Sequence, residues 1–297
     1  MTTIKRVALA GASGNLGPAI LKALLGANFD VTVLTRKDST SNFPKASNLK
    51  VVAVDYASTE SLTSALQGHD ALISTLASLA LPVQLGLFDA AAAAGVRRVI
   101  PSEFGSNTTI SPTKELPVFG HKIQVQKHLA ELAAKDSNFS YTLVLTNAFF
   151  DWGLQVGSIV NVKARTAELC DGGDRPFSTT SLAGIGKAVV GVLQHPDETK
   201  NRAVKVHEAV LTQNRLVNIA EKLSGDKFKR TTWDTKEGET KAYEALKKGD
   251  YSGMVSFIKR AIWAEGYGGE FTDVDNELLG VKMLSDNEIK EIVAKYV

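Results

Sequence analysis

The stretch Val7-Ala-Leu-Ala-Gly11-Ala-Ser-Gly14-Asn-Leu-Gly17 decides the fold of this chain. An apolar run leads into three glycines spaced G-x-x-G-x-x-G, and an amphipathic run over residues 18–25 follows them. A second apolar run, Val31-Thr-Val-Leu-Thr-Arg36-Lys37, ends on two cations. This order predicts a buried strand, a tight turn, a helix and a second strand, which together form a β-α-β unit.

Each glycine of this turn has a physical reason to be there. Gly11 permits the tight turn out of the strand, Gly14 lets the backbone approach a pyrophosphate, and Gly17 lets helix and strand pack closely. The helix N-terminus offers free N–H groups and a positive dipole to phosphates. We therefore expect a dinucleotide at this turn. The residues expected to bind it here are Gly11, Ser13, Gly14, Asn15, Leu16 and Gly17.

The end of the second strand indicates which dinucleotide binds. NAD-specific sites usually place Asp or Glu there, where the carboxylate accepts from the ribose 2′-OH. This strand instead ends in Arg36 and Lys37, two cations that can pair with a 2′-phosphate. We therefore expect NADPH as the cofactor. The alternative is that both side chains are ordinary solvated cations in a loop.

Strands and helices alternate through roughly the first 150 residues. The expected strands span residues 7–10, 31–35, 49–54, 71–75, 98–100 and 141–145. The expected helices span residues 15–25, 59–66, 83–94 and 119–134. Repeated β-α units predict a Rossmann-type α/β fold with a doubly wound parallel sheet. The strands are apolar without alternation, so both faces of the sheet should be buried.

The pattern changes after Trp152. We expect helices over 181–193 and 212–223, the latter capped by Thr212, and a strand over 201–206. The segment 226–280 is richer in charge and aromatics, and we interpret it as helical, forming a lid or small substrate domain. We thus divide the chain into a dinucleotide-binding domain, residues 1–155, and a smaller substrate-binding or lid domain, residues 156–297. No Gly/Ser linker separates them, so they should partly interleave.

Composition narrows the class of protein. The chain has 297 residues, of which 44% are hydrophobic and 22% charged, enough for one large domain and a small one. A net charge of +2, evenly spread, argues against a nucleic-acid or membrane partner. Cys170 is the only cysteine, so a reducing compartment is the default. No apolar run approaches the ~18 residues of a membrane span. We therefore expect a cytoplasmic protein.

Ligands of open parallel sheets bind at the carboxyl ends of the strands, so the residues after each strand are candidates. We expect Asp55 to meet the adenine. The segment Thr75, Leu76 and Ala77 should lie near the riboses. After the fifth strand, we expect Ser102, Glu103 and Phe104 to contact the nicotinamide half or shape its pocket, although Glu103 could instead cap a neighbouring helix.

Polar and aromatic residues follow the sixth strand. Asn147 is expected at the cofactor, and Phe149, Phe150 and Trp152 could wall a nicotinamide and a flat substrate. The three aromatics would serve equally well as core between two domains.

Three segments resemble a known family: Arg97-Arg-Val-Ile-Pro101-Ser-Glu-Phe-Gly105, Val118-Phe-Gly-His-Lys122-Ile-Gln-Val and Tyr141-Thr-Leu-Val-Leu-Thr-Asn147-Ala-Phe149. They are similar to the isoflavone reductase-like group of atypical short-chain dehydrogenases, within the wider NmrA-like family. That group includes phenylcoumaran benzylic ether reductases and pinoresinol-lariciresinol reductases. The resemblance covers most of the chain and implies NADPH as cofactor and Lys122 as the catalytic lysine. One departure is Thr146, where the family often has Gly.

By its position alone, Lys122 is better explained as a solvated cation than as a catalytic group, and the family resemblance is what favours the catalytic role. Desolvation beside a bound cofactor would lower the pKa of its amine and let it exchange a proton with a phenol or enolate. The usual dyad of short-chain dehydrogenases, Tyr-x-x-x-Lys, occurs at Tyr243-Glu-Ala-Leu-Lys247, far past the sheet edge. Its absence from the helix after the fifth strand argues against an epimerase or ketoreductase. The histidines have no metal-ligand spacing, so we expect no metal.

These observations predict an NADPH-dependent reductase that transfers a hydride to a small conjugated, aromatic substrate, with Lys122 as acid or base. The alternative is a non-catalytic NmrA-like regulator that senses the dinucleotide and has no need of Lys122. The expected assembly is a monomer or homodimer. The substrate itself and its stereochemistry stay open.

Overall fold

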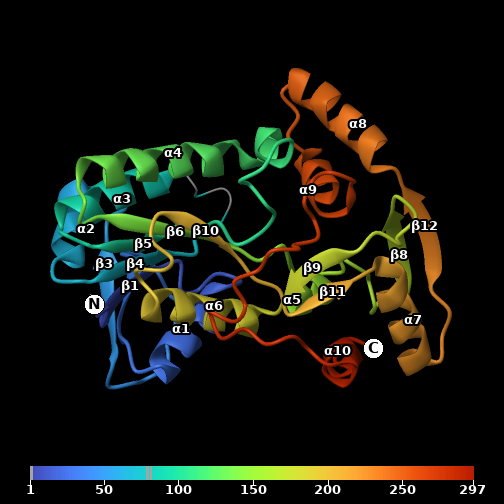
Figure 1. The fold of residues 1–297 in the computed structure, drawn as a ribbon, viewed down its shortest axis with the longest axis horizontal. Coiled ribbons are helices and arrows are strands. Elements are labelled where there is room, and N and C mark those ends of the chain that lie inside the picture. Colours follow the sequence, from blue (N-terminus) through green and yellow to red (C-terminus); the bar gives the residue numbers. More distant parts are fainter. Residues whose placement is uncertain (1–2, 78–79, 81) are drawn as a thin grey trace.

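A seven-stranded sheet forms the centre of the larger part of the molecule in the computed structural model, which describes residues 3–77, 80 and 82–297 (Figure 1). The strand order is β10-β6-β5-β4-β1-β2-β3, and every pairing is parallel. The strands are β1 (Arg6–Ala10), β2 (Asp30–Arg36), β3 (Leu49–Val54), β4 (Ala71–Ser74), β5 (Arg98–Ile100), β6 (Ser140–Leu145) and β10 (Arg202–Lys205). The order reverses between β1 and β4, which confirms the predicted doubly wound Rossmann-type fold.

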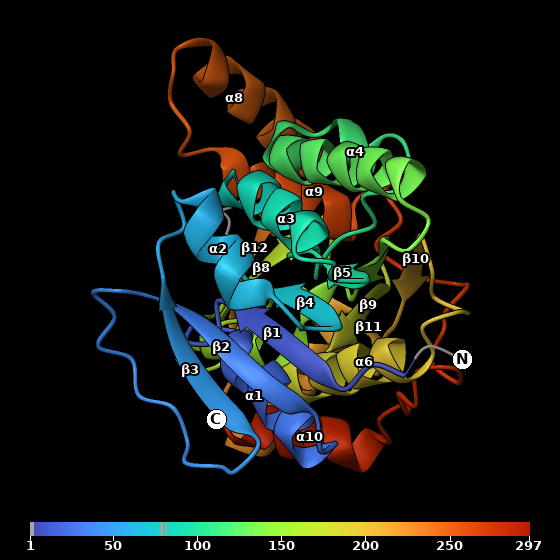
Figure 2. The ribbon, with the colours of Figure 1, turned by 90° about the vertical axis from the view of Figure 1, so that its left-hand side faces the viewer.

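Helices cover both faces of this sheet (Figures 1 and 2). One face carries α1 (Gly17–Gly26) and α6 (Leu182–Gln194), and the other carries α2 (Thr59–Leu66), α3 (Val83–Ala93) and α4 (Gly120–Lys135). Val7 and Leu9 of β1 belong to the core under α1 and α6, whereas Ala8 and Ala10 belong to the core under α2, α3 and α4. Successive residues of one strand therefore serve two cores, as the continuous apolar strands predicted.

The predicted elements of the first 150 residues all appear, with ends within two residues of those expected. The helix predicted over 212–223 is α7 (Gln213–Ser224), and the Thr212 side chain caps it by accepting from the backbone N–H of Arg215 at 3.0 Å. The local signals that predicted these elements, namely apolar runs, glycine turns and caps, are confirmed.

The smaller part of the molecule has a second core and two small sheets, of order β11-β9-β7 and β12-β8. Its elements are β7 (Ala148–Phe149), α5 (Phe150–Gln155), β8 (Thr166–Cys170), β9 (Phe177–Thr180), β11 (Ala209–Leu211), α7, β12 (Lys229–Trp233), α8 (Thr235–Lys247), α9 (Met254–Trp263) and α10 (Asp286–Ala294). Nowhere in the described residues is a helix long and apolar enough to cross a bilayer.

The prediction of a helical segment over 226–280 is only partly right. Helices α8 and α9 form, but β12 is a strand paired in parallel with β8, and residues 264–280 form neither helix nor strand. The side chains of β12 are almost all exposed, so no apolar alternation marks it in the sequence. Pairing with a distant strand, rather than local pattern, makes this segment extended.

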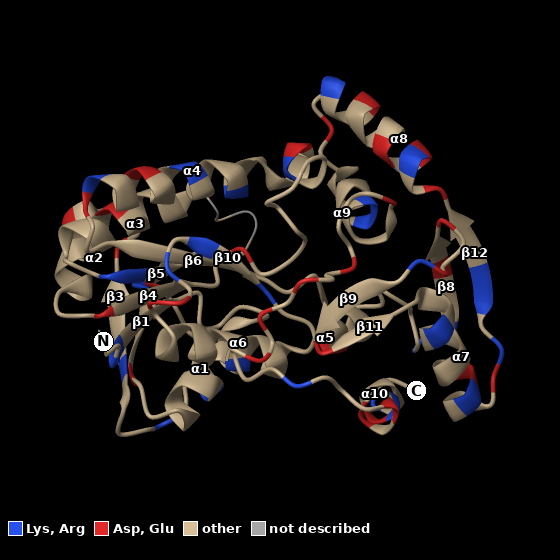
Figure 3. Cartoon of the chain, in the orientation of Figure 1, with Lys and Arg blue, Asp and Glu red and all other residues tan. Residues whose placement is uncertain are grey.

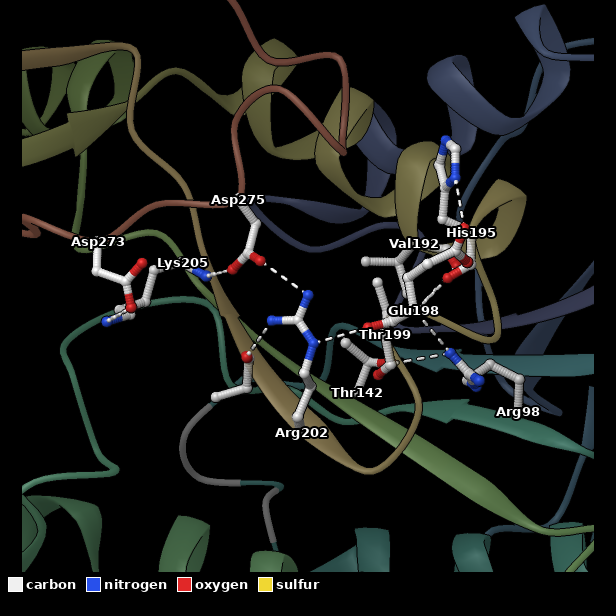
Figure 4. A network of polar contacts seen from close by, with 11 residues as sticks. Arg98, Thr142, Val192, His195, Glu198, Thr199, Arg202, Lys205, Asp273 and Asp275 are labelled. Carbon is white, nitrogen blue, oxygen red and sulfur yellow. Dashed lines mark hydrogen bonds and ion pairs between the residues drawn. The ribbon is translucent and has the colours of Figure 1, made fainter.

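The two parts of the chain interleave at β10 and α6, which follow residue 155 yet belong to the main sheet and its helical layer. Arg98 on β5 is 3% exposed and donates to Thr142 on β6 and to Thr199, at 3.0 and 2.9 Å (Figure 4). Burial lowers the pKa of Arg98 to about 10. Next to this cluster, Arg202 on β10 pairs with Asp275 at 2.8 Å. The domain boundary at residue 155 itself stays a prediction.

Replacing Arg98 by Met should lower the free energy of unfolding by roughly 2–4 kcal/mol, because buried oxygens that now accept hydrogen bonds would lose their donor. Urea unfolding measures this change. The control is Arg215→Met, which breaks an exposed pair with Asp286 and should cost at most about 1 kcal/mol. Equal costs for the two variants would show that the Arg98 cluster does not hold the interleaved parts together.

Candidate active site

The glycine turn after β1 combines two tightly packed glycines with one that is open. Gly11 has φ +83°, and a Cβ there would lie 2.7 Å from the Thr75 backbone; at Gly17 a Cβ would lie 2.3 Å from the Gly11 carbonyl oxygen. Packing alone therefore requires these two glycines. At Gly14 the nearest atom to an added Cβ is 3.4 Å away, and the residue is exposed. The fold does not need glycine at this position, but a ligand lying on the backbone would.

The N-terminus of α1 opens onto this turn. Its N-cap, Leu16, has a buried side chain that makes no cap hydrogen bond, and none of the described residues of the first turn is acidic. Ser13 and Asn15 are exposed beside it. Pro18 carries no N–H and the Ala19 N–H donates to the Leu16 carbonyl oxygen at 3.1 Å, so the Gly17 N–H and the helix dipole are what this terminus offers to an anion.

Hydrogen bonds hold the neighbouring strand ends together. The Thr75 backbone N–H and hydroxyl both donate to the Ala10 carbonyl oxygen, at 2.9 and 3.0 Å. The Ser102 hydroxyl donates to the Leu76 carbonyl oxygen at 2.8 Å, and Ala77 is exposed at the same edge. The structure therefore brings the glycine turn and the segments after β4 and β5 to one edge of the sheet.

Three further candidates lie exposed beyond β2 and β3, on the same edge. Arg36 ends β2 with a side chain that is 75% exposed, and its nearest carboxylate is that of Asp38 at 3.9 Å. Lys37 and Asp55 are also exposed, and Asp55 accepts from the Ala57 backbone at 3.0 Å. A guanidinium this free of protein partners can still pair with a ligand anion.

Lys122 lies in the first turn of α4 and is held from two sides. Its Nζ donates to the Glu103 carbonyl oxygen and lies 5.9 Å from the centre of the Phe119 ring. Burial lowers the pKa of the Lys122 amine, and the Glu103 carboxylate opposes this shift by raising it. The amine is thus oriented and biased towards the neutral form, as a proton-exchanging lysine requires.

Glu103 is 1% exposed, and its carboxylate bonds to protein groups. It accepts from Thr108 Oγ1 at 2.9 Å and from Gln126 Nε2 at 3.0 Å. Gln126 lies one helical turn after Lys122, so its bond holds α4 against the loop after β5. Gln126 was not among the site residues expected from the sequence, although its i+4 spacing from Lys122 was a usable signal.

A cavity of about 600 Å³ opens beside Lys122. Its lining at this end includes Phe104, Lys122, Asn147, Phe149 and Trp152. The Phe149 and Trp152 rings meet edge to face, with centroids 6.2 Å apart. Flat aromatic walls of this kind suit a flat aromatic ligand.

Two expected residues differ in their placement. Phe150 does not line the cavity with Phe149 and Trp152. It is the first residue of α5, and its side chain is fully buried in the second core. Asn147 does line the cavity, with φ +50° and 2% exposure. Its Nδ2 donates to the Gly269 carbonyl oxygen, and its Oδ1 is buried without a partner in the described structure.

The far wall of the cavity comes from β8 and α9, which the sequence analysis did not assign to the site. The lining residues there include Thr166, Glu168, Cys170, Val255, Ile258, Lys259, Ile262 and Trp263. Burial raises the pKa of the Cys170 thiol to about 12, so Cys170 serves as wall rather than nucleophile. Tyr243, of the discarded dyad, packs on the Phe257 ring instead and is not among the described residues that line the cavity.

The model of the NmrA-like family matches residues 3–241 of the chain. The chain belongs to the NmrA-like family. Oxidoreductase poxI of Penicillium oxalicum is 33% identical over 293 residues, covering 94% of this chain and 91% of that protein. The isoflavone reductase homolog IRL of Zea mays is 27% identical over 242 residues, covering 76% of each. These relatives confirm the resemblance to isoflavone reductase-like proteins.

Solved structures agree with this membership at the level of fold. The structure of AtPrR2 with NADP+ and (+)pinoresinol superposes on this NmrA-like protein with a TM-score of 0.80 at 22% identity, and each chain is covered over 100% of its length. The match extends through the smaller part of the molecule, so all three sheets and the residues that line the cavity lie within the matched length.

The Lys122 amine should titrate below the exposed lysines, whose pKa is about 10.4. Reductive ¹³C-methylation followed by NMR titration measures this, with Lys122→Met identifying the resonance. Glu103→Gln should lower the pKa of Lys122 further, because it removes the negative charge that stabilises the ammonium. A Lys122 resonance that titrates together with the surface lysines would contradict the burial of this amine.

Proposed function

We propose that this protein is an NADPH-dependent reductase of small conjugated, aromatic substrates, with Lys122 as the acid or base. One observation carries the proposal. The Lys122 amine is oriented by a hydrogen bond, has a lowered pKa, and borders a cavity with aromatic and aliphatic walls at the carboxyl edge of the main sheet. Such an amine can exchange a proton with a group bound in the cavity.

The residues at the sheet edge fit NADPH. The uncapped N-terminus of α1 and the open backbone at Gly14 suit its pyrophosphate, and Arg36 suits its 2′-phosphate. The name of the AtPrR2 structure, which includes NADP+, supports the same cofactor. Bound NADPH would supply the hydride.

The chain's own residues would then position the substrate and move a proton. Phe149 and Trp152 would pack on the substrate rings, and the free Oδ1 of Asn147 would accept a hydrogen bond from bound ligand. Lys122 would give its proton to, or take one from, an oxygen of the conjugated system. The name of the AtPrR2 structure also includes (+)pinoresinol, which supports a small aromatic substrate for this protein.

A dinucleotide-sensing regulator is the competing function, since the sequence analysis left it open. A regulator would bind NADPH, show no turnover and gain a protein partner on binding. It would have no use for the oriented amine of Lys122 beside a cavity, so we favour the reductase.

Arg36→Met should weaken NADPH binding at least tenfold and leave NADH binding unchanged, because one charge-assisted phosphate contact is worth roughly 1.5–3 kcal/mol. Titration of both dinucleotides by isothermal calorimetry checks this. The control, Lys50→Met, removes an exposed cation on the adjacent strand β3 and should change neither affinity. Equal wild-type affinities for NADPH and NADH would refute the cofactor assignment.

Lys122→Met should remove most turnover, by about 10²–10⁴-fold, while NADPH affinity stays within a few-fold. Lys122→Arg should not restore turnover, because a guanidinium does not release its proton near neutral pH. The control on the same helix is the exposed Lys127→Met, which should be as active as wild type.

The pH profile gives a second measure of the same role. In Glu103→Gln, the limb of the profile that belongs to Lys122 should move to lower pH, because the pKa of the amine falls when the carboxylate charge is removed. A Lys122→Met variant with full activity on substrates that wild type reduces would rule out proton transfer by this residue.

A further inference from the structure

Strand β8 gives the cavity a polar wall. Thr166, Glu168 and Cys170 all line the cavity, and their spacing of two places them on one face of this strand. The intervening Ala167 and Leu169 are buried in the second core. The strand therefore presents Glu168 to the cavity rather than to the second core.

Helix α9 forms the facing wall. Its lining residues Val255, Ile258, Lys259 and Ile262 follow the i, i+3, i+4, i+7 spacing of one helical face. Val255 and Ile258 are 53% and 39% exposed, so apolar surface is left open along the cavity. Lys259 is the one charged position in this set.

Lys259 on α9 and Glu168 on β8 form an ion pair between Nζ and Oε1, which joins the two elements in the wall of the cavity. The ammonium also lies 4.2 Å from the centre of the Trp233 ring. An ammonium has three N–H donors, and these two contacts leave it a further one. Glu168 Oε2 receives no hydrogen bond from any described residue, and the Glu168 side chain is 43% exposed. The pair thus offers a donor and an acceptor side by side.

A second donor in the same wall is unused. Trp263 lines the cavity, is 3% exposed, and its indole N–H has no partner in the described part of the chain. A buried N–H without a partner carries a desolvation cost that a bound acceptor would relieve.

We propose that the Lys259–Glu168 pair is a subsite for a neutral polar group of the substrate that both donates and accepts, a phenolic or alcoholic hydroxyl or an amide. A carboxylate would have to compete with Glu168 for the ammonium, and a purely apolar group would cover the ion pair without replacing its water. The substrate class is therefore a molecule with a conjugated, reducible group at Lys122 and a hydroxyl or amide at the Lys259–Glu168 pair. This inference rests on the proposed reductase function for the assignment of the reducible group only.

Binding of three chalcones tests the subsite without any need for turnover. The probes are 4-hydroxychalcone, 4-methoxychalcone and 4-carboxychalcone, which share one conjugated body. Quenching of intrinsic fluorescence gives the dissociation constants, because Trp152 and Trp263 line the cavity and Trp233 lies beneath Lys259. Wild type should bind the hydroxy probe at least tenfold more tightly than the other two, the scale of one hydrogen bond to a charged group.

Two variants and a matched control complete the test. Lys259→Met and Glu168→Gln should each reduce the preference for the hydroxy probe to about threefold or less. Lys241→Met breaks an exposed ion pair with Glu237 on α8 and should leave the preference unchanged. If the pair only ties α9 to β8, the variants will lower the melting temperature but keep the preference.

Each other outcome also decides the matter. Equal binding of the hydroxy and methoxy probes by wild type, or no binding of any probe, would overturn the subsite. Tighter binding of the carboxy probe would assign the pair to an anion instead. NADPH oxidation in the same samples is scored separately: a hydroxyl preference without turnover would contradict the reductase function and leave the subsite standing.

Discussion

The two ends of Glu103 fix the geometry on which the candidate site depends. Its backbone carbonyl holds the Lys122 amine, and its buried carboxylate holds Thr108 and Gln126. One residue in the loop after β5 thereby ties that loop to the first turns of α4. Without that coupling, the long flexible side chain of Lys122 would have no defined position relative to the sheet edge.

The interleaved chain then creates the cavity beside this amine. Helix α6 and strand β10 return to the main sheet after the chain has already formed β7, α5, β8 and β9, so the smaller part is anchored on both sides. The buried Arg98 cluster fixes one of these returns. As a result, β8 and α9 stand opposite the strand ends of the main sheet. Charged residues of both signs are spread over both parts of the molecule (Figure 3).

Local sequence signals predicted the main sheet, because glycine turns, apolar runs and caps act over a few residues. The same reasoning found Lys122 only with the help of family resemblance, since its burial depends on a loop almost twenty residues away in the chain. It could not find Lys259 or Glu168, whose contact spans 91 positions. It also could not separate Phe149 from Phe150, because the strand ends between them and their side chains diverge into the cavity and the second core. Strand β12 was not predicted for a related reason, since only its pairing with β8 makes this segment extended.

The central claim is that the glycine turn and Lys122 serve one bound cofactor whose reactive ring borders the cavity. The most direct test is a crystal structure of the protein with NADPH. Our account predicts the pyrophosphate on the Gly14 backbone at the N-terminus of α1, the 2′-phosphate at Arg36, and the nicotinamide ring at the cavity beside Lys122. A nicotinamide ring outside the cavity, separated from Lys122 by protein, would contradict it.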